Sequence, residues 1–267
     1  MTCLSTSSGQ PGPAEPASGV WQEPFQIHSY DVDFRKRATA EAICRAFLEA
    51  AWNHAEQLGF GYVALARQNK LWVMARLLVQ IDSYPIWGER VSVATWPRGV
   101  SGLFALRDFE LFNARKQRLV TGASSWLILD ATTHRPRRLD KFDMHIPRQE
   151  ARTAAGREPA RLRLQEPGKA VLTTTAHYSD IDVNLHVNSA RYISWLLDSY
   201  SDAFHQSHML YSLELNYTAE TRWADTVSVS SQQLNSLEFA HAITRADKSE
   251  VCRAHFRWII APETAPF

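Results

Sequence analysis

Segment 177–200 holds the densest set of side chains that could carry out acid–base chemistry. It reads HYSDIDVNLHVNSARYISWLLDSY, with acidic, amide and imidazole groups close together before an apolar stretch with helical spacing. These polar residues are Asp180, Asp182, Asn184, His186 and Asn188. A carboxylate, an amide and an imidazole in one place can polarise a carbonyl group and activate a water molecule. The pattern therefore marks this segment as a candidate site of acid–base catalysis.

The predicted start of the helix that follows offers a further chemical group. Its backbone N–H groups around Val187 and Asn188 could hold the oxygen of an activated carbonyl. His186 beside them could position a substrate or relay a proton near neutral pH. The alternative is helix capping by Asn188 or Ser189, with the nearby acids favouring the helix dipole. One cap is enough for a helix, so capping alone is the weaker explanation for the three polar residues at 182, 184 and 186.

Two similar halves run through the chain. LLVQIDSYPIWGERVSV at 77–93 matches LELNYTAETRWADTVSV at 213–229 with an offset of 136. Upstream, Tyr30 falls on Tyr178 at an offset of 148, and downstream Trp126 falls on Trp258 at an offset of 132. Offsets that shrink in steps are expected if structural elements persist while loops differ. The order of the matches predicts a duplicated unit.

The repeat tests whether the polar residues serve the fold or a site. At these offsets the first half has other residue types: the pairs are His186 with Ala38, Asn184 with Lys36, and Glu220 with Tyr84. A slip of two residues in this loop would instead place Asp82 opposite Glu220. Glu220 follows a predicted strand, where a carboxylate is most simply an exposed turn residue. Groups that occur in only one of the two halves indicate a functional site, because a structural need shared by both halves would place them in both.

Each half has the same predicted order of elements: a short extended piece, one helix and four strands. Apolar spacing near 3.6 residues predicts a helix over 43–58, which Gly59 ends, and another over 193–204. Alternating or β-rich runs follow each helix. They cover 71–81, 90–96, 103–112 and 119–129 in the first half, and 209–217, 226–233, 238–246 and 251–260 in the second.

This order predicts an α+β fold in which an antiparallel sheet wraps around a long helix. Two such units can join their sheets edge to edge and so cover exposed edges. The predicted organisation is a disordered lead-in over 1–22, an N-terminal unit over 23–136, a linker over 137–170 and a C-terminal unit over 171–262.

The composition excludes several classes of protein. Basic and acidic residues number 29 and 28, whereas general nucleic-acid binding needs a strongly basic face. No apolar run reaches the roughly 18 residues that cross a bilayer. Three scattered cysteines without zinc spacing indicate a reducing, cytoplasmic setting. Residues 1–20 contain no Arg or Lys, which argues against a secretory signal or a transit peptide.

Other chemical motifs are absent or weak. The chain has no Gly-x-Ser-x-Gly, no P-loop, no Gly-x-Gly-x-x-Gly and no His-Glu-x-x-His. His205 and His208 are a weak zinc pair at best. We therefore expect no metal and no cofactor. The basic clusters at 115–118 and 135–141 are most simply solvated surface, and the alternative is a binding surface for an acidic partner.

Several segments resemble the acyl-acyl carrier protein (ACP) thioesterases. DIDVNLHVNSARYISWLLDS is similar to the Asp-x-Asn-x-His-Val-Asn motif of that family. NHAEQLGFG, KLWVMARLLVQIDSYPIWGERVSVATWP and GASSWLILDATTHRPRRL are similar to its N-terminal unit. The resemblance runs from Phe25 to Ile260. It implies a double hotdog fold, in which the N-terminal unit shapes an acyl pocket and the C-terminal unit carries the chemistry.

The resemblance also implies site residues. Asp182, Asn184 and His186 match the family's catalytic positions. Glu220 matches the glutamate of its Tyr-Arg-Arg-Glu-Cys stretch, which here reads YTAET. Thr221 therefore stands where a cysteine was once proposed as the nucleophile, and this departure counts against a Cys–His mechanism.

The implied reaction is hydrolysis of an acyl-ACP thioester to a free fatty acid and the carrier thiol. Glu220 would act as general base on water, or Glu220 or Asp182 would attack directly through an anhydride. The expected partner is an acyl carrier protein that bears an acyl-phosphopantetheine group, and a homodimer is left open. The alternatives are an acyl-coenzyme A thioesterase, a hotdog dehydratase and a non-catalytic acyl-carrier binding module. Acyl chain length is left open as well.

Overall fold

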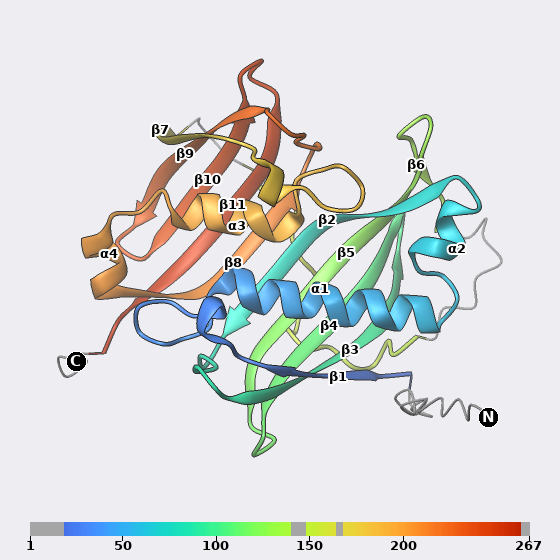
Figure 1. The fold of residues 1–267 in the computed structure, drawn as a ribbon, viewed down its shortest axis with the longest axis horizontal. Helices are drawn as coiled ribbons and strands as arrows, with labels where there is room; N and C mark the ends of the chain where they lie inside the picture. Colours follow the sequence, from blue (N-terminus) through green and yellow to red (C-terminus); the bar gives the residue numbers. More distant parts are fainter. Residues whose placement is uncertain (1–18, 140–147, 164–167, 263–267) are drawn as a thin grey trace, which may run out of the picture.

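The computed structural model describes residues 19–139, 148–163 and 168–262, and it contains two units of similar build (Figure 1). The first unit consists of β1 (Trp21–Gln26), the 3-10 turn η1 (Ser29–Asp31), α1 (Ala40–Gln57), α2 (Tyr62–Ala66), β2 (Lys70–Ile81), β3 (Arg90–Ser101), β4 (Phe104–Asn113), β5 (Arg118–Asp130) and β6 (Pro136–Arg137). The second consists of β7 (Lys169–Thr175), the 3-10 turn η3 (Tyr178–Asp180), α3 (Ser189–Leu197), α4 (Asp202–Ser207), β8 (His208–Tyr217), β9 (Thr226–Asn235), β10 (Glu238–Arg245) and β11 (Glu250–Ile260).

The strands of both units form one antiparallel sheet. Its order is β1-β3-β4-β5-β2-β8-β11-β10-β9-β7, and β6 pairs with β5. The units join where β2 pairs with β8, with Arg76 opposite Asn216 and Gln80 opposite Ser212. Helices α1 and α3 lie on the same face of the sheet (Figure 1). The predicted α+β fold, with two helix-wrapping sheets joined at an edge, is confirmed.

The predicted strands match the observed ones to within two residues, except that β3 continues five residues beyond its predicted end, to Ser101. The second predicted helix is wrong in its extent. The apolar pattern over 193–204 crosses a break between α3, which ends at Leu197, and α4, which begins at Asp202. Ser201 starts the new helix because its side chain accepts a hydrogen bond from the amide of Phe204. Tyr200 and Phe204 still stack, with ring centroids 4.8 Å apart. The apolar spacing over 193–204 therefore indicated which residues pack against the core, and it did not indicate one continuous helix.

The start of the first unit also differs slightly from expectation. Strand β1 begins at Trp21, two residues inside the segment expected to be a lead-in, and Trp21 pairs with Thr95 of β3. The remainder of that lead-in up to residue 18 lies outside the described residues. No helix within the described ranges is long and apolar enough to span a membrane.

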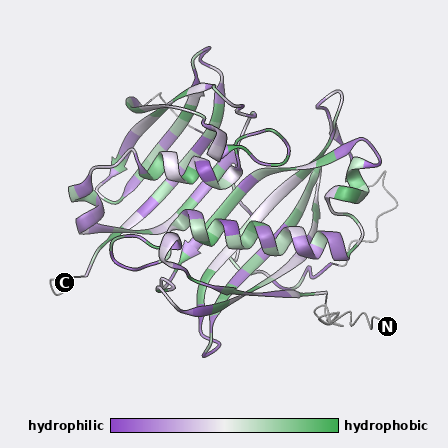
Figure 2. Ribbon diagram, viewed as in Figure 1, coloured by the Kyte–Doolittle hydropathy of each residue, from purple (hydrophilic) through white to green (hydrophobic). Residues whose placement is uncertain are grey.

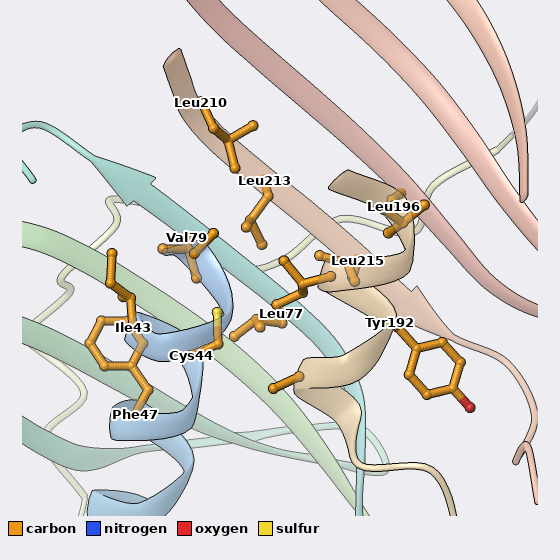
Figure 3. Close-up of a cluster of buried hydrophobic side chains, with 14 of the residues drawn as sticks. Ile43, Cys44, Phe47, Leu77, Val79, Tyr192, Leu196, Leu210, Leu213 and Leu215 are labelled. Carbon is orange, nitrogen blue, oxygen red and sulfur yellow. The ribbon is translucent and has the colours of Figure 1, made fainter. Parts of the chain in front are cut away.

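The two helices and the sheet enclose one continuous hydrophobic core. Apolar and polar residues mix along the strands (Figure 2), and the central parts of β3, β4 and β5 are buried in continuous runs, as in a sheet covered on both faces. Figure 3 shows α1 contributing Ile43, Cys44 and Phe47, with Leu77 on β2 and Leu215 on β8 among the neighbouring residues. The core therefore runs across the β2–β8 junction and fixes the two units to each other.

The linker covers the opposite face of the sheet. Ala154 donates its amide to Asp108 Oδ2 at 2.8 Å, and Leu162 donates its amide to Asn216 Oδ1 at 2.8 Å. Arg157 makes two hydrogen bonds to Glu214, at 2.9 and 2.7 Å. These contacts satisfy polar side chains that would otherwise be buried on the outer face without partners. Segment 148–163, part of the predicted linker, thus straps both units together.

Candidate active site

A cavity of about 1150 Å³ lies between the first unit and the loop that precedes α3. Its apolar wall comes from α1, α2 and the strands of the first unit, and includes Ala51, Trp52, Phe60, Met74, Leu106 and Trp126. Its polar wall includes His134, Asp182, Asn184, His186, Ser189 and Glu220. All four predicted catalytic side chains therefore line one cavity. Its size and mostly apolar surface suit a long apolar ligand with a polar end.

Glu220 and His186 are in direct contact. His186 Nε2 lies 2.9 Å from Glu220 Oε2, and the two side chains are 20% and 25% exposed. Two elements bring them together, because the amide of Val187 donates to the carbonyl of Thr221 at 2.8 Å. This bond fixes the loop before α3 against the segment that follows β8. A half-buried carboxylate next to an imidazole can accept a proton from water or from a substrate.

The loop that carries His186 is shaped by Asp182. Asp182 Oδ1 accepts the amides of Asn184 at 2.8 Å and His186 at 3.3 Å, and the Asp182 amide donates to the carbonyl of His186 at 2.8 Å. Leu185 at the tip has a φ of 62°, a conformation that few residues other than glycine adopt. The carboxylate of Asp182 is thus already engaged in the turn that presents His186.

The first unit contains the same turn, and its position corrects the sequence alignment. Asp33 Oδ1 accepts the amides of Arg35 and Arg37, and the Asp33 amide donates to the carbonyl of Arg37. Lys36 has a φ of 60°, which matches Leu185. The two loops therefore correspond at an offset of 149, and the predicted offset of 148 was wrong by one residue.

The corrected alignment changes which residues are peculiar to the second unit. Arg37, rather than Ala38, stands opposite His186, and Arg35, rather than Lys36, stands opposite Asn184. The Glu220 pairing with Tyr84 holds, since the carbonyls of Pro85 and Thr221 accept equivalent amides. Asp182, by contrast, has a structural counterpart in Asp33. A turn-forming role for Asp182 is therefore shared by both units, whereas the imidazole, the amide and the glutamate occur in one.

The two amides proposed to hold a carbonyl oxygen are not free. The Val187 amide donates to Thr221, and the Asn188 amide donates to the carbonyl of Asp180 at 2.8 Å. The Asn188 side chain caps α3 by accepting the amide of Ala190 at 2.9 Å, as the capping alternative predicted. Among the described residues, the Ser189 amide has no acceptor. Ser189 lines the cavity, and its amide is the first of α3, where backbone N–H groups lack helical partners.

Sequence reasoning missed His134, which also contacts Glu220. His134 follows β5 in the first unit, and its Nδ1 lies 3.3 Å from Glu220 Oε1. Arg222 Nη2 lies 3.7 Å from Glu220 Oε2, and Arg245 donates to the Glu220 carbonyl at 3.2 Å. The signal for this contact in the sequence was limited to a histidine beside the basic cluster at 135–141.

One buried cation in the cavity wall was also missed. Arg107 on β4 is 7% exposed, and its Nη1 donates to His54 Nδ1 at 3.1 Å and to Thr95 Oγ1 at 3.2 Å. Burial lowers the pKa of Arg107 to about 9. Burial, together with the nearby guanidinium, lowers the pKa of His54 to about 3, so His54 is neutral and can accept this hydrogen bond. The apolar wall therefore contains one polar cluster.

Comparison with known proteins agrees with this architecture. Residues 18–143 match the acyl-ACP thioesterase N-terminal domain, and residues 167–260 match the acyl-ACP thioesterase C-terminal domain. The chain belongs to the acyl-ACP thioesterase family. The fold is accordingly a double hotdog, with one hotdog unit in each half.

Relatives of this acyl-ACP thioesterase family member come from plants and bacteria. The chloroplast oleoyl-acyl carrier protein thioesterase 1 of Arabidopsis thaliana is 30% identical over 225 residues, which cover 78% of this chain and 62% of that protein. The dodecanoyl-[acyl-carrier-protein] hydrolase of Cinnamomum camphora is 30% identical, with 90% of this chain and 67% of that protein covered. This chain thus spans less than two thirds of the length of the Arabidopsis relative. An acyl-ACP thioesterase structure from Bacteroides thetaiotaomicron superposes with a TM-score of 0.80 at 28% identity, covering 90% of this chain and 98% of that one.

Proposed function

We propose that this protein hydrolyses acyl-ACP thioesters to a free fatty acid and the carrier thiol. The observation that carries the proposal is the 2.9 Å contact between His186 and Glu220 at the wall of a largely apolar cavity. An acyl chain would occupy the apolar part of the cavity and bring its thioester carbonyl to the polar wall. The family relatives named as acyl-ACP thioesterases and hydrolases support the same reaction.

The geometry suggests a role for each side chain. Glu220 would remove a proton from the attacking water, and His186 would orient that water or the substrate. Among the described residues, the side-chain amide of Asn184 has no partner, so it is available to bind the water or the thioester. The Ser189 amide at the start of α3 would donate to the carbonyl oxygen as negative charge develops on it. Asp182 would act through the turn that holds Asn184 and His186.

Direct attack by a carboxylate is the alternative route. Glu220 or Asp182 would form an acyl anhydride, which water would then hydrolyse. Single-turnover hydrolysis in ¹⁸O-labelled water separates the two routes. In the anhydride route, labelled oxygen enters a carboxylate of the protein when water attacks the protein's carbonyl, so label found by mass spectrometry in the peptide containing Glu220 or Asp182 establishes that route. Water attack leaves both peptides unlabelled.

Basic residues near the polar wall suit an acidic carrier protein. Arg222 is 64% exposed beside Glu220, and Arg245 also lines the cavity. Contacts between exposed charges weaken as salt is added. We expect turnover of acyl-ACP to fall steeply with ionic strength, and turnover of the matching acyl-coenzyme A to fall less. Equal salt dependence would favour the acyl-coenzyme A thioesterase alternative. A homodimer and a cytoplasmic location remain expectations.

The decisive experiment measures free thiol released from a panel of acyl-ACP and acyl-coenzyme A substrates. We expect Glu220→Gln and His186→Ala each to lower kcat by at least about 100-fold, because both remove a group that handles the proton. Arg37→Ala is the matched control, since Arg37 occupies the position of His186 in the unit without the glutamate. Circular dichroism confirms folding of each variant. Near-normal turnover in the first two variants refutes the site, and binding of acyl-ACP without thiol release supports a binding module.

A further inference from the structure

The carboxylate of Glu220 lies between two imidazoles that come from different units. His186 of the second unit faces Oε2 at 2.9 Å, and His134 of the first unit faces Oε1 at 3.3 Å. Nothing in the expected reaction calls for the second imidazole. A carboxylate that is contacted at both oxygens cannot rotate freely about the bond that joins it to the rest of its side chain. Its remaining lone pairs therefore point in fixed directions.

The hairpin that carries His134 is built to aim it. Asp130 Oδ1 accepts the amides of Thr132 at 3.1 Å and Thr133 at 2.9 Å, and Asp130 Oδ2 accepts from Arg137 at 2.6 Å. The His134 amide closes the turn by donating to the Asp130 carbonyl at 2.9 Å. Arg137 holds the pKa of Asp130 well below its usual range, so this acceptor is ionised across the working pH range.

His134 itself has a φ of 53°, in the left-handed region that most residues other than glycine avoid but that histidine, asparagine and aspartate adopt more often. The imidazole is 45% exposed, so burial in the core does not account for its placement. Within the described residues, the contact with Glu220 is the polar contact that its side chain makes.

We propose that His134 is a positioning residue, which the first unit supplies to the catalytic centre of the second. Its Nδ1, 3.3 Å from Glu220 Oε1, would hold that oxygen in place and leave Oε2 directed at His186 and at the attacking water. This inference rests on the proposed function, because it assigns to His134 the orientation of the general base. It also means that catalysis depends on the contact between the two units, because separating them would remove one of the two imidazoles that position Glu220.

Arg222 is the competing explanation for how Glu220 is held. It stands two residues beyond Glu220 on the same unit, and its Nη2 lies 3.7 Å from Oε2, the oxygen that His186 also faces. Its side chain is 64% exposed, and exposed ion pairs contribute little to order. Oε1 has no donor other than His134 among the described residues. The orientation of Glu220 therefore depends on the hairpin more than on Arg222.

Three single variants of the full chain test the inference with dodecanoyl-ACP as the probe. His134→Gly removes the imidazole and also relieves the left-handed backbone, so a loss of rate cannot be due to strain. His134→Asn tolerates the same backbone conformation and places a side-chain amide donor where Nδ1 was. Thr132→Ala alters the same hairpin without touching Glu220.

We expect His134→Gly to lower kcat by about tenfold to a hundredfold, the usual effect of losing one hydrogen bond to a charged group, with KM changed less than about twofold. His134→Asn should recover most of that loss, and Thr132→Ala should match the wild type. His134→Gly turnover within about twofold of the wild type overturns the inference. So does a His134→Asn variant that is as slow as His134→Gly, or a loss confined to KM.

A second measurement does not depend on turnover. The ring ¹⁵N chemical shifts of His134 report its tautomer and its hydrogen bonding. We expect Glu220→Gln to change these shifts and Arg37→Ala to leave them as in the wild type. Unchanged shifts in Glu220→Gln overturn the positioning contact even if the enzyme is active. If the wild type releases no thiol while the shifts respond to Glu220→Gln, the contact stands and the proposed function fails.

Discussion

Replacement of Asp182 separates a structural role from a chemical one. The structure gives its carboxylate two backbone partners, the amides of Asn184 at 2.8 Å and His186 at 3.3 Å. A hydrogen bond to a charged group contributes about 1.5–3 kcal/mol when fully made. The loop is half-buried and the second contact is long, so we take about 2–3 kcal/mol for both together. Asp182→Ala removes this stabilising free energy from the ordered state of the loop.

The expected kinetic result follows from that energy. A loss of about 2–3 kcal/mol lowers the population of the ordered loop by roughly 30- to 150-fold, and kcat/KM should fall by a similar factor if only the ordered loop is active. Asp182→Asn keeps an oxygen that can accept the same amides, as asparagine does in this kind of turn. We therefore expect Asp182→Asn to retain kcat/KM within about fivefold of the wild type. The assay is thiol release from acyl-ACP.

The matched control is Asp33→Ala, which removes the same turn acceptor from the first unit. It should lower the free energy of unfolding while leaving turnover of the folded enzyme near the wild-type value. A fall of about 1,000-fold or more in Asp182→Asn, with hydrogen exchange showing an ordered loop, would refute the structural reasoning. That result would show that the negative charge of Asp182 takes part in the chemistry, as anhydride formation requires.

Two further predictions concern stability. Burial raises the pKa of Asp108 to about 6 from 3.8, so the folded protein binds this proton more tightly than the unfolded chain does. Relative to Asp108→Asn, the wild type should therefore gain about 2 kcal/mol of unfolding free energy as the pH falls from 7 to 4.5. It should lose this stability as the pH rises back through 6. Urea titrations of both proteins at the two pH values measure this, and parallel pH profiles would contradict it. Gly122→Ala should lower the unfolding free energy by about 1–3 kcal/mol, because its new methyl group would lie 2.6 Å from Cε2 of Phe47 in the core. Urea unfolding tests it, the compensating Phe47→Leu substitution should recover part of the loss, and an unchanged midpoint in Gly122→Ala would contradict the packing.

Much of the fold could be predicted from sequence because local periodicity reports it directly. The strands follow β-rich runs separated by turn residues, and α1 follows the spacing of Ile43, Phe47 and Ala50. The second helix was overextended because Tyr200 and Phe204 pack against the core, partly buried, on either side of a break. Periodicity detects a buried face, and it does not detect a change of helix axis.

The candidate site was less predictable because its decisive contacts are between distant segments. Glu220 was found through resemblance and the repeat, while its contact with His186 depends on a hydrogen bond between the Val187 amide and Thr221. That same bond occupies an amide that the sequence presented as free. His134 was missed because no local pattern connects a hairpin of the first unit with the end of β8. The offset of 148 was misplaced because Tyr30 and Tyr178 match in type, whereas the turns align one residue later.

The two equivalent loops show how a duplicated fold can divide its tasks. Both keep the residues that form the turn: an aspartate that accepts two amides, and a tip residue with a φ near 60°. In the second unit the side chains that this turn presents are Asn184 and His186, which face the cavity. In the first unit the equivalent Arg35 donates to the carbonyls of His205 and Gln206, at the end of α4 where carbonyls lack helical partners. The turn of one unit therefore presents chemical groups, and the same turn in the other unit binds the two units together.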